Sequence, residues 1–382
     1  MKARRLNNLQ EYYFSKKLRE VAAMVEEGRS VINMGIGSPD LPAHPKVVTA
    51  LEDSLDHPNL HQYQSYQGLP ELRQAIANFY QKYYHHTADP NCEILPLMGS
   101  KEGIMHISLA FLNPGDKALI PNPGYPTYQS VTRLVEAEPV FYDLKADHEW
   151  QPDLEAINQL DLTAVKLMWL NYPHMPTGAN AKKDTFQRLI LWAKEKGILL
   201  VNDNPYSFIL TDQPQSLMSI PDAKEVGMEL NSLSKSFNMA GWRVGMLLGK
   251  KENINSVLKV KSNMDSGMFY GIQKAAEVAL QTPESWFKVL NDEYTQRRKL
   301  IFELASLLNT DFETNKGGLF VWAKLRDNSK SSVEYIEEIL EKYNIFIAPG
   351  SIFGSQGEGY IRFSLCVGLG KISEAIERII KS

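Results

Sequence analysis

The sequence has little cysteine. Cys92 and Cys366 are the only two cysteines among 382 residues, and their wide separation argues against a disulfide framework or a cysteine-based zinc motif. We expect both to be core thiols. The eight histidines show no spacing typical of a metal site, so we expect no bound metal.

Long apolar runs and an excess of positive charge are also absent. No run reaches the ~18 residues of a membrane span, and the opening MKARRLNNLQEYYFSKKL lacks the apolar segment of a signal peptide. Lys+Arg 41 against Asp+Glu 45 gives a formal net charge of −4, which offers nucleic acid no basic surface. We therefore expect a cytoplasmic protein with neither a membrane nor a nucleic-acid partner.

Between about residues 93 and 249, short apolar runs alternate with helix-like segments. The runs KALIP, AVKLMWL, GILLVND, GMELNSL and RVGMLLG are apolar throughout, which is typical of strands buried on both faces of a mostly parallel sheet. Helical periodicity covers residues 15–27 and 69–84. After about residue 284 a long helix-like stretch, three short apolar segments and a final helix indicate a smaller α+β unit.

Two of the expected strands end in residues that carry chemistry. Ligands of an open parallel sheet bind beyond the carboxyl ends of its strands. GILLVNDNPY places Asp203 and Tyr206 there, and MELNSLSK places Lys235 there. A lysine at the end of a buried strand is suited to form a Schiff base. Pyridoxal 5′-phosphate (PLP) is the cofactor that needs such a lysine together with a carboxylate and a phosphate site.

The other groups that PLP requires also have candidates. Asp203 would keep the pyridine nitrogen protonated, so that the ring accepts electrons. Residues 99–101 would open a helix whose free N–H groups suit an anion. The hydroxyls and cations that would hold the phosphate belong to Ser100, Lys101, Ser232, Ser234 and Arg243.

The stretch SLSKSFNMAGWRVG, which contains Lys235, resembles the signature of the class I/II aminotransferases, which are fold-type I PLP enzymes. Other motifs follow in family order over nearly the whole chain: MGIGSPDLP, YQSYQGLPELRQAI, MGSKEG, PNPGYPTY, NYPHMPTGA, DNPY, GGLFVW and YIRFSL. GIGSPDLP and GSKEG are most similar to the subgroup that contains LL-diaminopimelate aminotransferase. The resemblance implies an α/β fold with a three-layer αβα large domain, a mostly parallel sheet and a smaller α+β C-terminal domain. We expect an arm and helix at 1–44 that pack on the small domain, the large PLP-binding domain at 45–284 and the small domain at 285–382.

The resemblance also implies roles for single residues. Tyr125 would stack on the cofactor ring, and Tyr206 would hydrogen-bond its phenolic oxygen. Arg362 would hold the substrate's α-carboxylate through two parallel N–H bonds, and Gly37 would leave backbone room for it. Tyr63 would reach the phosphate of the neighbouring subunit, which implies a homodimer with shared active sites.

One motif departs from the family pattern. The family usually reads Asn-Pro-Thr-Gly, and that asparagine donates to the cofactor's phenolic oxygen. Met175 stands at this place here, and a thioether sulfur donates no hydrogen bond. Asn171 and His174 are the candidates to supply the missing donor. In the arm, Tyr12, Tyr13 and Phe14 are candidates to line the substrate side-chain pocket.

The expected function is a PLP-dependent aminotransferase with Lys235, Asp203 and Tyr206 as catalytic residues. It would move an amino group between an L-amino acid and a 2-oxo acid, with 2-oxoglutarate expected, by a ping-pong Schiff-base mechanism. A carbon–sulfur lyase on the same fold and a ligand-sensing aminotransferase-like domain remain as alternatives. The glycines at GIG and GLGK do not complete a Rossmann or P-loop motif.

Overall fold

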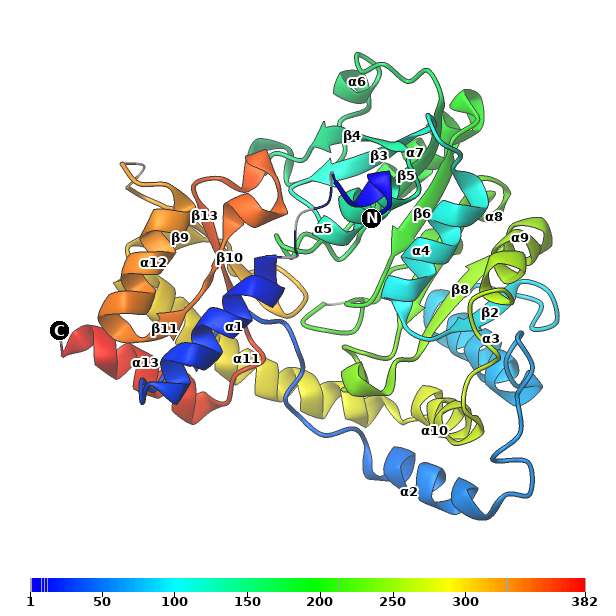
Figure 1. The fold of residues 1–382 in the computed structure, drawn as a ribbon, viewed down its shortest axis with the longest axis horizontal. Helices are drawn as coiled ribbons and strands as arrows, with labels where there is room; N and C mark the ends of the chain where they lie inside the picture. Colours follow the sequence, from blue (N-terminus) through cyan, green and yellow to red (C-terminus); the bar gives the residue numbers. More distant parts are fainter. Residues whose placement is uncertain are drawn as a thin grey trace.

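The main feature of the fold is a seven-stranded sheet with the strand order β2-β8-β7-β6-β5-β3-β4 (Figure 1). The computed structural model describes residues 2–7, 9, 11, 13–211, 213–327 and 329–381. The strands of this sheet are β2 (Ile94–Leu97), β3 (Lys117–Asn122), β4 (Glu138–Asp143), β5 (Val165–Leu170), β6 (Leu199–Asp203), β7 (Gly227–Ser232) and β8 (Gly245–Gly249). Strands β3 to β7 pair in parallel.

Helices cover both faces of this sheet, which explains why its strands are apolar throughout. Along β5, Leu167 and Trp169 face one core while Met168 and Leu170 face the other, because successive side chains of a strand point to opposite faces. The first core includes residues of α4 (Ser100–Phe111), α5 (Pro126–Leu134) and α9 (Lys251–Lys261). The second includes residues of α3 (Pro70–Tyr84), α7 (Lys183–Lys196) and α10 (Tyr270–Leu280). The predicted three-layer α/β fold is confirmed.

A second, antiparallel sheet has the order β12-β13-β10-β9 and lies to the left in Figure 1. It consists of β9 (Thr310–Phe312), β10 (Phe320–Leu325), β12 (Ala348–Pro349) and β13 (Tyr360–Ser364). The helices α11 (Glu284–Leu307), α12 (Ser332–Tyr343) and α13 (Leu369–Ile380) lie beside it. The other α-helices in the described part of the chain are α1 (Tyr13–Glu26), α2 (Pro45–Asp53), α6 (Leu154–Ile157) and α8 (Ala223–Val226).

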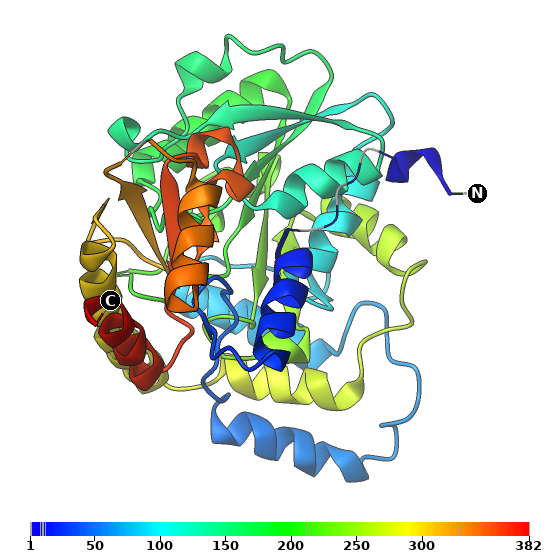
Figure 2. The same cartoon turned by 60° about the vertical axis from the view of Figure 1, so that its left-hand side comes forward.

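The N-terminal segment lies against these C-terminal elements (Figure 2). Strand β1 (Ile32–Asn33) pairs in parallel with β11 (Ile345–Phe346). On α1, Lys17 is buried and donates to Glu337 of α12 over 2.6 Å. The division of the chain into domains at residues 44 and 284 stays a prediction.

Within the mostly parallel sheet that was predicted, strand β8 runs antiparallel to β7 and β2. The twelve residues 233–244 contain only the short 3-10 helix Ala240–Trp242, whereas a parallel return usually requires a crossover helix. The prediction that both cysteines lie in the core is wrong for Cys92. Its thiol is half-exposed and donates to Asp89 Oδ2 over 3.2 Å, whereas Cys366 is buried.

No helix in the described part of the chain is both long and apolar enough to cross a membrane.

Candidate active site

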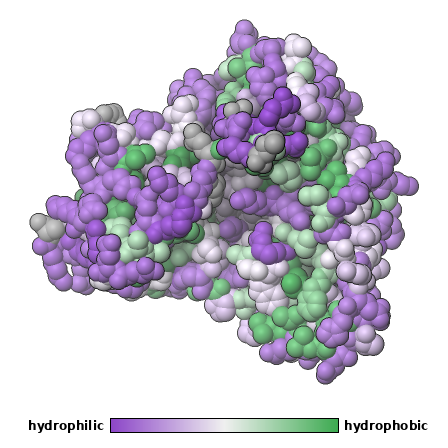
Figure 3. All heavy atoms as spheres, in the orientation of Figure 1, coloured by the Kyte–Doolittle hydropathy of each residue, from purple (hydrophilic) through white to green (hydrophobic). Residues whose placement is uncertain are grey.

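A cavity of about 470 Å³ lies between the carboxyl ends of the large sheet, helix α1 and the small sheet. The face seen in Figure 3 is hollowed near its centre, between these parts. The volume is in the range of small-molecule sites. The predicted site residues that line the cavity are Gly37, Ser100, Lys101, Tyr125, Asn171, Asp203, Tyr206, Ser232, Ser234, Lys235, Arg243 and Arg362.

Lys235 follows strand β7 and reaches into this cavity. Its Nζ donates to the backbone oxygen of Gly37 over 2.6 Å. Burial, assisted by the nearby positive charges of Arg362 and Arg243, lowers the pKa of Lys235. A lysine with a lowered pKa is more often uncharged and therefore acts as a nucleophile or a base.

Asp203 is the last residue of β6 and is buried. The Tyr128 hydroxyl donates to its Oδ2 over 2.9 Å, while Oδ1 has no hydrogen-bond partner among the described groups. Burial raises the pKa of Asp203 to about 7. A buried carboxylate oxygen without a partner is costly, and it suits a protonated nitrogen of a bound ligand.

One end of the cavity is built to hold an anion. Ser100 is the first residue of α4, so the unpaired N–H groups of this helix end point there. The preceding Gly99 has φ 91° and ψ 154°, and a Cβ at this position would lie 2.3 Å from Arg243 Nη2. Burial and the Arg243 charge lower the pKa of Lys101. Two cations next to the hydroxyls of Ser232 and Ser234 suit a phosphate dianion.

Arg362 lies on β13 at the opposite side of the cavity and is only 4% exposed. Its Nη2 donates to the Gly35 oxygen over 2.6 Å, and its Nη1 lies 3.3 Å from Met175 Sδ. The guanidinium carbon is 3.9 Å from the ring centre of Phe320 and 4.6 Å from that of Phe353. These rings hold the planar cation at the cavity, where it is suited to bind a carboxylate.

Comparison with known proteins agrees with this geometry. A model of the family described as aminotransferase class I and II matches residues 29–379. This chain belongs to that family. It is an enzyme of the aminotransferase type, and the predicted resemblance is confirmed.

Curated relatives match over nearly their whole length. The chain is 38% identical to an LL-diaminopimelate aminotransferase of Aquifex aeolicus, with 98% of this chain and 97% of the relative covered. It is 39% identical to the protein of that name from Halothermothrix orenii, with 100% and 98% covered. Among solved structures, substrate-bound BacF from Bacillus subtilis has a TM-score of 0.96 at 35% identity and covers 100% of this chain and 97% of its own.

Two tyrosines of this aminotransferase line the cavity with protonated hydroxyl groups. Tyr125 precedes α5, and Tyr206 follows β6. Burial raises the pKa of both hydroxyls, so each keeps its proton and can donate it in a hydrogen bond. Their predicted roles toward the cofactor ring stay predictions.

Met175 lines the cavity at the place of the family's asparagine. Of the two candidate replacement donors, Asn171 lines the cavity and its Nδ2 donates to the Asp203 backbone oxygen over 2.6 Å. His174 is absent from the described lining. Its ring nitrogens contact Thr177 Oγ1 and the Pro123 oxygen, and burial lowers its pKa to about 3.

Tyr63 is the predicted site residue that the structure places away from the cavity. Its side chain is 90% exposed, beside a groove against α9. In the arm, Phe14 lines the cavity, whereas Tyr13 does not belong to its described lining. Tyr12 lies outside the described residues.

Sequence reasoning missed several residues at the cavity. Tyr128 binds Asp203, and it stands three positions after Tyr125 in the PNPGYPTY motif. Phe320 fills the space that Gly37 leaves, since a Cβ at Gly37 would lie 2.2 Å from its ring. The motif GGLFVW contains Phe320 and gave a signal for it. Phe353 belongs to no motif, and only the folded chain brings it to Arg362.

Proposed function

We propose that this aminotransferase uses PLP to move an amino group between an L-amino acid and a 2-oxo acid, with 2-oxoglutarate as one acceptor. One observation carries the proposal. A lysine with a lowered pKa, a buried carboxylate oxygen without a described partner and an anion-binding helix end line a single cavity. Each matches one functional group of PLP.

The residues of the cavity fit the cofactor. Lys235 would bond to its aldehyde, and Asp203 Oδ1 would accept from its ring nitrogen. The phosphate would be held by Ser100, Lys101, Ser232, Ser234 and Arg243. When bound, the pyridine ring supplies an electron sink for the bond that breaks at the substrate's Cα.

The chain's own side chains then do three things. Arg362 holds the substrate's carboxylate and so fixes the direction of the Cα–H bond. The Lys235 amine takes the proton from Cα and later returns one, acting as base and then as acid. One cavity and one carboxylate-binding arginine serve both substrates in turn, which gives ping-pong kinetics. A homodimer belongs to this proposal, since Tyr63 projects from its own subunit and is available to a second copy.

Chemical labelling tests the lysine. Borohydride treatment of the PLP-loaded protein should add the mass of the reduced cofactor to the peptide that contains Lys235. Lys235→Ala should lose this label and all turnover but keep PLP affinity through the phosphate. Lys250→Ala is the matched control and should behave as wild type, since Lys250 stands between β8 and α9 and does not belong to the described cavity lining. A label on another lysine contradicts the assignment.

A substrate screen tests the reaction. The donors to offer with 2-oxoglutarate are the common L-amino acids and LL-diaminopimelate. The last is included because the curated relatives are named for it. Formation of glutamate with the donor's 2-oxo acid supports the proposal. Pyruvate and ammonia released from a thioether amino acid without an acceptor would identify a carbon–sulfur lyase instead.

A further inference from the structure

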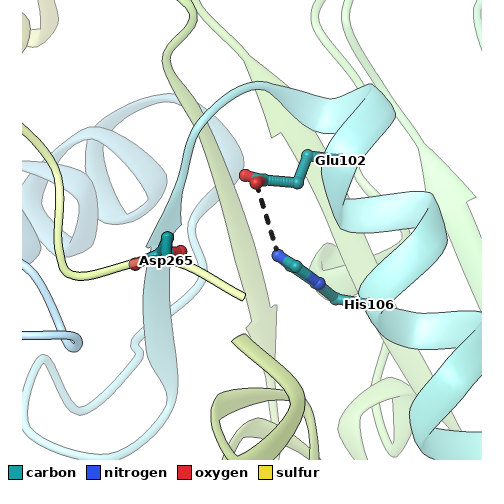
Figure 4. A group of neighbouring side chains, drawn as sticks. All are labelled: Glu102, His106 and Asp265. Atoms are coloured by element: carbon teal, nitrogen blue, oxygen red, sulfur yellow. Dashed lines mark ion pairs between the residues drawn. The ribbon is translucent and has the colours of Figure 1, made fainter. Parts of the chain in front are cut away.

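A cluster of three polar side chains, of which His106 is buried, lies behind the anion-binding end of α4 and outside the cavity lining. Glu102 and His106 project from α4 toward Asp265, which lies between α9 and α10 (Figure 4). His106 Nε2 is 3.6 Å from Glu102 Oε1. The ligand-type atoms of the three side chains all lie within 4.8 Å of one another.

The cluster already contains a cation. Lys261 is 1% exposed, and its Nζ donates to Asp265 Oδ1 over 2.9 Å. Neither ring nitrogen of His106 nor Asp265 Oδ2 makes a hydrogen bond with any described residue. A buried ammonium group repels a second cation at short range. The Lys261 ammonium group therefore argues against a metal ion beside Asp265.

At one end, the cluster holds the phosphate side of the active site. Glu102 Oε2 accepts from the backbone N–H of Met98 over 3.0 Å. This bond fixes the turn of Met98 and Gly99, which leads into Ser100 at the start of α4. Glu102 thus holds the turn that leads into the anion-binding helix end.

At the other end, Asp265 holds a turn against the loop that carries Tyr63. Its Oδ1 accepts from the Gly267 N–H over 2.8 Å. Gly267 has φ +88°, and a Cβ there would lie 2.3 Å from the Gln64 oxygen. The two backbones are therefore in direct contact, one residue away from Tyr63.

A second buried side chain joins the same two segments. Gln273 is fully buried, accepts from the Leu69 N–H and donates to the Met268 oxygen, each over 2.7 Å. The loop at residues 63–69 is thus attached to the 262–268 segment at both of its ends. Such a loop can present a fixed side chain to another molecule.

These two segments expose apolar side chains together. Tyr63 is 90% exposed, Met264 60%, Tyr66 44% and Phe269 43%. Exposed apolar groups on rigid segments are typical of a protein interface. A second copy of this chain is the occupant that we choose, because Tyr63 has no place in its own cavity.

We propose that Asp265 is a positioning residue for the partner subunit's active site. It holds the Tyr63 loop in the position from which Tyr63 reaches the partner's phosphate. Glu102 and His106 lie within 4.8 Å of the same carboxylate, and Glu102 separately holds the turn before α4. The inference rests on the proposed function, since it requires PLP and a dimer with shared sites.

The first experiment compares two ligands. Asp265→Ala removes the acceptor for the Gly267 N–H, so it should raise the Kd for PLP about tenfold and leave the Kd for pyridoxal, which lacks the phosphate, unchanged. Ile336→Val, a core substitution in α12, controls for a general loss of stability and should leave both Kd values unchanged. Equal changes for PLP and pyridoxal would overturn the proposal.

A second variant covers the case in which Asp265→Ala does not fold because Lys261 loses its partner. The Lys261→Met/Asp265→Leu double variant removes both buried charges together, which proteins tolerate better than the loss of one partner. It also removes the acceptor for the Gly267 N–H, so the same selective loss of PLP affinity is expected. A wild-type Kd for PLP in the folded double variant would overturn the proposal.

Mixed dimers locate the effect. In a hybrid of Asp265→Ala with Lys235→Ala subunits, the one site that has Lys235 receives Tyr63 from a subunit with an intact Asp265. The amount of PLP fixed by borohydride at this site should rise with PLP concentration as it does in wild type. In a hybrid of wild type with the Lys235→Ala/Asp265→Ala double variant, the site with Lys235 receives Tyr63 from the altered subunit. This site should show the weakened affinity. Equal affinities in the two hybrids would overturn the inference.

Two further results separate this inference from the proposed function. Absence of PLP binding by the wild-type protein, or a monomer that binds PLP fully, would refute the proposed cofactor or the proposed dimer. One equivalent of metal in the wild-type protein that is lost in His106→Ala would identify a metal site and overturn the positioning role.

Discussion

At the scale of single residues, burial decides the chemistry of the side chains that the motifs supply. Lys235 and Asp203 are both surrounded by protein, and burial shifts each pKa toward the uncharged form. Neither shift follows from the residue type alone. Both groups become suited to exchange protons with a ligand near neutral pH.

Arg362 should bind every amino-acid substrate, because all of them carry an α-carboxylate. Losing a charge-assisted pair costs about 2–5 kcal/mol, so Arg362→Ala should lower kcat/KM for every donor irrespective of its side chain. Steady-state kinetics over the donor panel measures this. Arg326→Ala, an exposed arginine paired with Asp311, should have no effect. A loss confined to acidic donors would make Arg362 a side-chain selector instead.

Met175 should set the pH at which the absorption of the PLP-loaded protein changes. An asparagine there would donate to the cofactor's phenolic oxygen and stabilise the form that has lost its proton. A hydrogen bond to a charged group contributes about 1.5–3 kcal/mol, part of which water supplies in its absence, so Met175→Asn should lower the transition by about one pH unit.

A spectral titration of Met175→Asn against wild type measures this shift. Met175→Leu adds no donor and serves as the matched control, which should titrate as wild type. No change in Met175→Asn would mean that a donor is already in place. Asn171, which lines the cavity, would be the residue to substitute next.

At the scale of elements, parallel strands bring the active-site residues to one edge. Asn171 directly follows β5, Asp203 ends β6 and Ser232 ends β7. These strands are neighbours in the sheet, so residues about thirty positions apart in sequence line one cavity. The N-terminus of α4 adds backbone donors that no side-chain motif can show.

Gly99→Ala should weaken PLP binding, because the added methyl group meets Arg243 and the φ of 91° is strained for a residue with a Cβ. We expect a rise of about tenfold in the Kd for PLP, since Arg243 must move away from the phosphate end. Gly115→Ala is the matched control. Gly115 has φ +87° with open space around its Cβ position, so this variant should lose stability through backbone strain but keep its PLP affinity.

At the scale of the whole molecule, the active site depends on parts that are remote in sequence. Helix α1 and residues 35–37 come from the first tenth of the chain, while Phe320, Phe353 and Arg362 come from the last sixth. The large sheet supplies the proposed cofactor-binding side, and the small sheet supplies the carboxylate-binding arginine. Relative placement of the two sheets thus decides whether both ends of a substrate are held.

The stability of the PLP-free protein should fall as the pH rises through the range in which Asp203 titrates. Burial raises the pKa of Asp203 from 3.8 to about 7, so between these values the folded state binds the proton that the unfolded state has released. At 1.36 kcal/mol for each pH unit, this group removes up to about 4 kcal/mol of unfolding free energy between pH 4 and pH 7.

Urea unfolding at pH 5, 6, 7 and 8 tests this linkage. Asp203→Asn has no proton to lose at this position. The unfolding free energy of the wild type should therefore fall relative to that of the variant as the pH rises to about 7. Saturating PLP should abolish this trend in the wild type, since its ring nitrogen supplies the missing partner. A difference that is constant with pH would contradict the raised pKa.

The sequence by itself determined the class of fold and most of the cavity. Apolar runs separated by helical segments specify a sheet buried on both faces, because burial of each strand is a local property of its side chains. The residues of the lysine motif, with Asp203 and Arg362, were predictable for a related reason. Asp203 and the lysine motif lie at the ends of apolar strands, and Arg362 lies within one. Such positions can be recognised from the neighbouring sequence.

Only the tertiary structure decided where these parts meet. It made β8 antiparallel, placed Phe353 on Arg362, turned His174 away from the cavity and left Cys92 half-exposed. It also put Tyr63 far from its own cavity and connected its loop to the distant Asp265 through Gly267. Contacts of this kind join residues that are dozens to hundreds of positions apart. No periodicity or motif records them, because they depend on how already formed elements pack.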